Sequence, residues 1–227
     1  MIEIKNVTKA YSLGGEVFKA LDDVSLTIPT GQMIAITGHS GSGKSTLLNM
    51  ISGLDIPSSG EILVDGKDYQ KMNDKELSLF RSEHIGFIFQ QFYLEPEYSV
   101  YENIVLPLAI TKCNAEEIAQ KGFDMLKSLD MLEKSSQKVR YLSGGEQQKC
   151  CIGRALIKNP EIIFADEPCG NLDSVNGKMV MNILLDLKKQ GKTIVLVTHN
   201  MSDARMADRM ITMKDGKVIK DELLSHH

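Results

Sequence analysis

MIAITGHSGSGKST, residues 33–46, decides the fold of this chain. Its first five residues predict a short buried strand, and residues 44–52 predict a helix. Between them, residues 38–45 match the spacing G-x-x-x-x-G-K-[ST], in which glycines let successive backbone N–H groups face one concavity. The start of the helix adds the positive end of its dipole, so the pattern predicts a loop that binds phosphate groups.

The side chains of this loop suit a nucleotide carrying a metal ion. Lys44 supplies a mobile positive charge for the β- and γ-phosphates, and Ser45 offers a hydroxyl group to Mg²⁺. We expect the whole loop to contact ATP, through Gly38, His39, Ser40, Gly41, Ser42, Gly43, Lys44, Ser45 and Thr46.

A second predicted strand, residues 161–165, ends in two adjacent carboxylates, Asp166 and Glu167. Charges are costly inside a sheet, and open parallel sheets bind ligands at the edge where their strands end. We therefore expect Asp166 to hold Mg²⁺, directly or through water, and Glu167 to polarise the attacking water. An ordinary polar strand end is the alternative, and the phosphate loop favours the functional interpretation.

Outward from these motifs, strands alternate with helices. Strands are predicted at 85–89 and 193–198, and helices at 74–83, 115–129, 144–158 and 174–190. Residues 2–30 predict antiparallel pairing around a turn at 13–15, and Asp65-Gly66 and Asp215-Gly216 predict two further hairpins. The fold class is therefore α/β, with a parallel sheet, an antiparallel edge from the opening hairpins and a helical insertion.

The composition excludes several functional classes. The chain has 227 residues and a net charge of −4, without the basic excess of a nucleic-acid binder. Its longest apolar run, 104–110, is far shorter than the ~20 residues that span a bilayer. We expect no signal peptide and a cytoplasmic protein that reaches a membrane only through a partner chain. His226 and His227 are interpreted as the stub of a tag and excluded.

The four cysteines, Cys113, Cys150, Cys151 and Cys169, show neither C-x-x-C spacing nor a histidine at metal-ligand spacing. A zinc site or a disulfide framework is therefore not expected, and reduced core thiols are the default.

LSGGEQQ, residues 142–148, opens one of the predicted helices. Ser143 and Glu146 form a capping box, which alone would explain the motif. Two glycines in the first turn, Gly144 and Gly145, weaken the helix by about 1 kcal/mol each relative to alanine. They also expose backbone N–H groups beside the serine hydroxyl. The motif therefore predicts a second anion-binding element.

Across essentially its whole length the sequence resembles the ATP-binding subunits of ABC transporters. LSGGE is similar to the signature LSGGQ of that family, with Glu146 at its last position. The fragments LLNMISGLDIPSSGEI, IGFIFQQFYLEPEYSVYENIVLPL and EPCGNLDS resemble the macrolide-export, lipoprotein-release and FtsE-like branch. Residues 149–151, KCC, depart from the arginine and small apolar residues of many relatives.

The resemblance implies a P-loop NTPase core of the ABC type, with ATP and Mg²⁺ as ligands. It implies that one nucleotide-binding domain covers 1–227. Residues 1–90 and 160–227 would form the ATPase core with its antiparallel β subdomain, and 91–159 an inserted helical subdomain that contains the signature.

The resemblance also implies roles for single residues. Tyr11 matches the aromatic residue that stacks on adenine, and Gln90 matches the glutamine that reaches Mg²⁺ and the attacking water. Asp173 matches a loop that crosses to another subunit, although it also suits a helix N-cap. His199 matches the histidine that contacts the γ-phosphate, and the spacing of one βαβ unit independently puts it at the same sheet edge as Asp166.

The residues alone leave open whether Ser143, Gly144, Gly145 and Glu146 meet ATP on their own subunit or on another. The resemblance implies a homodimer in the ATP-bound state, which buries two nucleotides between the loop of one copy and the signature of the other. Closure would depend on the γ-phosphate and end on hydrolysis.

Residues 91–101 concentrate aromatic and apolar side chains after Gln90. They suit either a lid over the core or a groove for a partner. The resemblance favours a groove for a helix of an integral membrane permease, MacB-like or FtsX-like. The residues concerned are Phe92, Tyr93, Leu94, Pro96, Tyr98, Val100 and Tyr101.

The predicted function is ATP hydrolysis that powers export or mechanotransmission by this permease, at the inner face of the cell membrane. The alternatives are an FtsE-like regulatory ATPase in cell division and a soluble ABC-type ATPase outside transport. A scaffold with a silent site is disfavoured by the presence of Lys44, Asp166, Glu167 and His199.

Overall fold

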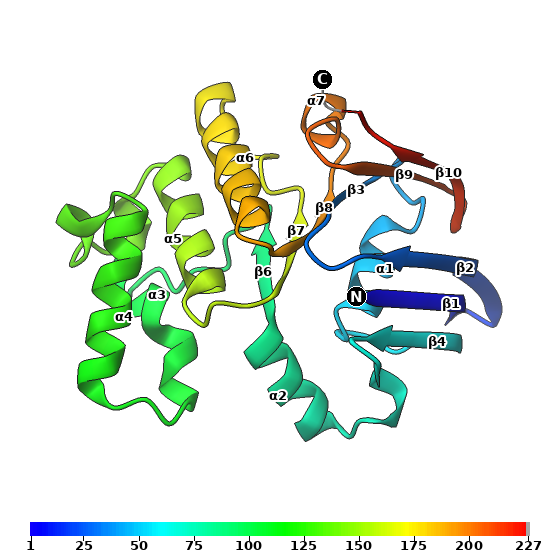
Figure 1. The fold of residues 1–227 in the computed structure, drawn as a ribbon, viewed down its shortest axis with the longest axis horizontal. Coiled ribbons are helices and arrows are strands. Elements are labelled where there is room, and N and C mark those ends of the chain that lie inside the picture. Colours follow the sequence, from blue (N-terminus) through cyan, green and yellow to red (C-terminus); the bar gives the residue numbers. More distant parts are fainter. Residues whose placement is uncertain (226–227) are drawn as a thin grey trace.

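The computed structural model describes residues 1–225, and the interpretation of His226 and His227 as a tag lies outside this range. Two sheets organise the chain (Figure 1). The larger has six strands in the order β10-β9-β3-β8-β7-β6. Five of these strands are parallel, and β10 pairs antiparallel with β9. Their bounds are β3 (Met33–Thr37), β6 (Ile85–Phe89), β7 (Ile162–Asp166), β8 (Thr193–Val197), β9 (Arg209–Lys214) and β10 (Lys217–Leu223).

The central strands of this sheet are buried on both faces, as expected for a parallel sheet. Along β7, Ile162 and Phe164 point into one hydrophobic cluster, whereas Ile163 and Ala165 point into a second one. Because side chains alternate along a strand, each central strand contributes to two cores at once.

The opening hairpins form an antiparallel sheet of their own, with four strands in the order β2-β1-β4-β5. This agrees with the β subdomain that the resemblance implied, whereas the expectation from the strand pattern alone, an antiparallel edge of the parallel sheet, is wrong for these strands. The strands of the separate sheet are β1 (Ile2–Leu13), β2 (Glu16–Ile28), β4 (Ser59–Val64) and β5 (Lys67–Asp68). As a separate layer, this sheet packs its apolar face against α1 and one face of the parallel sheet.

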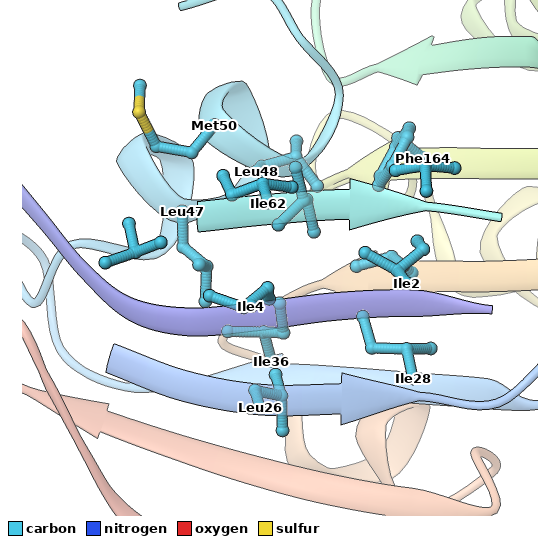
Figure 2. Close-up of a cluster of buried hydrophobic side chains, with 14 of the residues drawn as sticks. Ile2, Ile4, Leu26, Ile28, Ile36, Leu47, Leu48, Met50, Ile62 and Phe164 are labelled. Atoms are coloured by element: carbon cyan, nitrogen blue, oxygen red, sulfur yellow. The ribbon is translucent and has the colours of Figure 1, made fainter. Parts of the chain in front are cut away.

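The first hydrophobic cluster lies between the two sheets (Figure 2). Ile2 and Ile28 of the antiparallel sheet, Leu47 of α1 (Lys44–Ile51) and Phe164 of β7 are fully buried there. The helix that follows the phosphate loop is therefore fixed against both sheets.

The second cluster covers the opposite face of the parallel sheet, where α3, α4, α5 and α6 gather on one side of the molecule (Figure 1). Capping boxes open α2, α4 and α5, with Asn73, Asn114 and Ser143 as N-caps. The box at Ser143 is the one predicted above. The remaining helices are α2 (Asp74–His84), α3 (Val100–Val105), α4 (Ala115–Ser128), α5 (Gly144–Leu156), α6 (Ser174–Lys189) and α7 (Met201–Ala204), with 3₁₀ turns η1 (Tyr69–Lys71), η2 (Leu106–Ile110), η3 (Leu132–Lys134) and η4 (Val139–Tyr141).

The cysteines are free thiols, as predicted, with Cys150 and Cys151 buried and the other two half-buried. Burial raises the pKa of Cys150 to about 12, so this thiol stays protonated and inert. Within residues 1–225, none of the helices combines the length and the hydropathy needed to traverse a bilayer.

Candidate functional site: a nucleotide cleft and a separate signature

A cleft of about 1010 Å³ opens where β3, β7 and β8 end. It brings together residues that the sequence places far apart. The predicted residues that line it are Tyr11, Gly38, His39, Ser40, Gly41, Gly43, Lys44, Ser45, Thr46, Gln90, Asp166, Glu167 and His199. Ser42 is buried behind the loop instead and does not line the cleft.

Two glycines let the phosphate loop pass close to neighbouring strands. Gly43 has a φ of 98°, and a Cβ atom there would lie 2.5 Å from the carbonyl oxygen of Ala20 in β2. A Cβ atom on Gly38 would overlap the carbonyl oxygen of Met213 in β9. Lys44 Nζ donates to the carbonyl oxygens of Gly38 and His39, at 2.8 Å each, which holds its charge over the loop.

The turn between β9 and β10 fastens this loop to the antiparallel sheet. The backbone N–H of Gly216 donates to the carbonyl oxygen of Ser42 at 3.1 Å, and that of Asp22 donates to the carbonyl oxygen of Gly216 at 3.0 Å. The loop is therefore held from both sheets. This arrangement fixes the directions of its N–H groups before a ligand arrives.

Glu167 is held by two hydrogen bonds from the residue at the end of the neighbouring strand. The backbone N–H of His199 donates to Glu167 Oε1 at 3.0 Å, and His199 Nδ1 lies 2.8 Å from the same oxygen. The Glu167 side chain is 18% exposed, whereas that of His199 is 73% exposed. An oriented, largely shielded carboxylate at the cleft wall suits a general base.

Asp166 lies deeper in the cleft and contacts the phosphate loop. Burial raises the pKa of Asp166, and the adjacent Glu167 raises it further, against the lowering effects of the Ser45 hydrogen bond and of Lys44. Ser45, Asp166 and Gln90 all line the cleft and offer oxygen atoms, the donors that Mg²⁺ prefers. The Gln90 side chain also donates to Asn171 Oδ1 at 3.2 Å, which ties it to the loop that follows β7.

Tyr11 stands at the mouth of the cleft with its ring 38% exposed. Its hydroxyl donates to Asp55 Oδ2 at 3.1 Å, and Lys9 Nζ lies 5.1 Å from the ring centroid. Lys9 also forms an ion pair with Asp55 at 2.7 Å. Asp55 and Lys9 thus hold the ring in place, and a flat base can stack on the face of the ring that remains free.

The signature residues lie elsewhere. Ser143, Gly144, Gly145 and Glu146 open α5, and none of these four described residues lines the cleft of their own chain. A Cβ atom on Gly145 would overlap the side chain of Asn176, which in turn donates to Asp173 Oδ2 at 2.7 Å. Asp173 caps α6 through the N–H groups of residues 175 and 176, so the signature packs against the start of α6.

A family model that spans about two-thirds of the chain identifies its family. Residues 21–170 match the family model described as ABC transporter. The chain is an ATP-binding domain of the ABC transporter family.

Among its relatives, this ABC domain is 48% identical over 221 residues to the macrolide export ATP-binding/permease protein MacB of Chlorobaculum tepidum. The match includes 97% of this chain but 34% of that protein. The chain therefore spans about a third of the length of the MacB-type relatives. It is 44% identical to the ABC transporter ATP-binding protein MJ0796 of Methanocaldococcus jannaschii, with 99% of the chain and 97% of the relative covered.

Solved structures agree with this fold. A dimeric post-hydrolysis state of MJ0796 bound to ADP and Pi superimposes over 100% of both chains, with a TM-score of 0.92 and 42% identity. The structure of cbiO1 from Clostridium perfringens superimposes over 98% of this chain and 88% of the cbiO1 chain, with a TM-score of 0.87 and 28% identity.

Several residues that line the nucleotide cleft of the ABC domain were not predicted from the sequence. Phe18 of β2, Met213 and Lys214 of β9, and Ile219 of β10 border the same cleft. Their sequence surroundings show only strand alternation. The antiparallel sheet and the last hairpin bring them to the nucleotide loop, and no local pattern reports that proximity.

Proposed function

We propose that this chain is the ATP-binding and ATP-hydrolysing subunit of an ABC transporter, and that ATP joins two copies into a homodimer. The observation that carries the proposal is the division between the cleft and the signature. One chain gathers the phosphate loop, both carboxylates and His199, while Ser143 to Glu146 lie outside that cleft.

Nucleotide binding follows from the cleft. The N–H groups of the phosphate loop and Lys44 bind the phosphates, and the start of α1 adds the favourable end of its dipole. The exposed face of Tyr11 receives the adenine ring, a stacking contact of a kind worth about 1–3 kcal/mol.

Hydrolysis follows from Glu167. Its carboxylate accepts a proton from the water that attacks the γ-phosphate, and the two hydrogen bonds from His199 hold it in position. Ser45, Gln90 and Asp166 would hold Mg²⁺, which neutralises charge on the β- and γ-phosphates when bound. His199 is exposed enough to meet the γ-phosphate while it contacts Glu167.

Completion of each site requires a second copy. The exposed Ser143 and Gly144 present a hydroxyl and free N–H groups at the start of α5, which suit the triphosphate of a facing subunit. MJ0796, of similar length, forms dimers in its solved structures. We therefore assign both ATP molecules to the interface between two copies.

We assign the membrane partner to residues 91–101 and the adjoining groove. Tyr93 and Tyr98 are 64% and 44% exposed, whereas Val100 is buried, so this segment is not simply a lid. Arg154 of α5 donates to the carbonyl oxygens of Phe92 and Tyr93.

Leu156, the last residue of α5, lines a groove of about 1560 Å³ between α2, η2, α4 and the end of α6. Ile110 and Leu79 border this groove and are 80% and 56% exposed. An apolar surface of this kind suits an amphipathic helix. The partner would be an integral permease, MacB-like or FtsX-like, which places the subunit at the inner face of the membrane. Residues 91–159 would act as the helical subdomain that transmits the movement.

Glu167→Gln tests the proposal. The variant should bind ATP, lose about 10²-fold or more of its turnover, and form a stable dimer with Mg²⁺-ATP, because the general base is removed while the phosphate loop and Lys44 are unchanged. Light scattering and phosphate release measure both effects.

Glu161→Gln is the matched control, because Glu161 lies next to the other end of β7 and is 67% exposed. It should hydrolyse ATP normally and remain monomeric after turnover. A Glu167→Gln protein that stays monomeric with saturating Mg²⁺-ATP would refute the composite site.

A further inference from the structure

The carboxylate of the signature has a cationic partner outside the motif. Lys134, at the end of η3, forms an ion pair with Glu146 Oε1. The other carboxylate oxygen, Oε2, accepts the backbone N–H of Ser143 at 2.9 Å, which closes the capping box. The Glu146 side chain is 28% exposed and that of Lys134 is 42% exposed, so the pair lies at the rim of the signature.

The negative charge of Glu146 opposes the binding of an anion at the start of α5. A negative charge in the first turn stabilises a helix by offsetting the positive end of its dipole. The same charge lowers the positive potential that the start of α5 offers to a triphosphate. The Lys134 hydrogen bond is the largest of the effects that lower the pKa of Glu146, so this carboxylate is ionised at neutral pH.

We propose that Lys134 is a positioning residue of the signature, which neutralises Glu146 and thereby keeps the start of α5 able to bind the triphosphate of a facing subunit. This inference rests on the composite site proposed above. Lys134 would act through Glu146 and would not touch the nucleotide itself.

A purely structural salt bridge is the competing explanation. Exposed ion pairs contribute little to stability, and the capping box already fixes Glu146 through Ser143. The two explanations differ in one respect. Neutralisation predicts that the effect of Lys134 on dimer formation depends on the charge at position 146, whereas a structural role predicts an effect on unfolding.

The test is a double-mutant cycle in the Glu167→Gln background. Lys134→Met keeps the aliphatic stem and removes the charge. Glu146→Gln removes the opposing charge and keeps the capping box, because glutamine also serves at this position. The measured quantity is the ATP concentration at which half the protein is dimeric by light scattering, together with ATP affinity of single chains and the thermal unfolding temperature.

Lys134→Met alone should raise this half-dimer concentration about tenfold, which corresponds to roughly 1.4 kcal/mol. In the Glu146→Gln background the same change should have an effect of less than about twofold. The unfolding temperature and the ATP affinity of single chains should stay unchanged throughout, because Lys134 lies outside the cleft.

An unchanged half-dimer concentration in Lys134→Met would overturn the inference. So would an equal loss in both backgrounds, which would mean direct contact with phosphate, or a lowered unfolding temperature that accounts for the whole effect. Absence of a dimer in the Glu167→Gln parent would instead overturn the composite site, and the inference with it.

Discussion

The nucleotide cleft and the signature are both built at helix N-termini, but their surroundings are opposite. The start of α1 faces a cleft bordered by β7, β8 and β9, where Lys44 from α1 approaches Asp166 and Glu167 at the end of β7. The start of α5 presents Ser143 and Gly144 at an exposed surface, with Lys134 and Asn176 as neighbours. One chain therefore carries a cleft that gathers the predicted ATP-binding residues and, outside it, a second helix start, which the proposed dimer would use on a facing subunit.

Lys44→Met should produce the largest change, and it would act on the cleft alone. Loss of a charge-assisted contact to phosphate should weaken ATP binding by single chains about 100-fold, as measured by calorimetry. Lys75→Met, on α2 and away from the cleft, is the control and should bind ATP normally. Normal affinity in Lys44→Met would show that the loop is not the phosphate site.

Ser143→Ala should act on the signature alone, with a smaller effect. Turnover should fall about tenfold because one hydrogen bond to the facing triphosphate is lost, while ATP affinity of single chains should change less than about twofold. The helix loses its N-cap as well, so the unfolding temperature must be measured beside the rate. An equal loss in single-chain affinity would place the signature and the cleft around the same nucleotide, within one chain.

Tyr93→Ala should leave both regions intact and give the smallest effect on the isolated subunit. The exposed ring lies after Gln90, and its backbone is already held by Arg154. Basal ATP hydrolysis should stay within about twofold, while stimulation by the membrane partner in vesicles should be lost. A comparable loss of hydrolysis by the isolated chain would indicate that the loop supports the cleft and not a partner.

The sequence predicted those parts of the molecule whose causes are local. The phosphate loop lies between a strand and a helix as expected, because glycine spacing and apolar runs act over a few residues. The capping box of Ser143 and Glu146 forms as predicted for the same reason. Asp166 and His199 lie at one sheet edge because a βαβ unit returns the chain to the same side.

Features that depend on distant contacts could not be predicted. The resemblance implied the antiparallel β subdomain, but local patterns could not give its pairing, because β4 pairs with β1 across more than fifty residues and nothing in either strand specifies that partner. Tyr11 is fixed by Asp55, and Glu146 by Lys134, through long side chains that follow no periodic spacing. These contacts hold the predicted side chains in place, but only the folded structure shows them.

The double burial of the central strands restricts how this chain can change in length. A one-residue insertion within β7 would exchange the side chains of Ile162 and Phe164 with those of the opposite face, and both hydrophobic clusters would be disrupted together. Insertions and deletions are therefore tolerated in connecting segments such as the turn at Gly14-Gly15, where a Cβ atom would meet no neighbour within 4 Å.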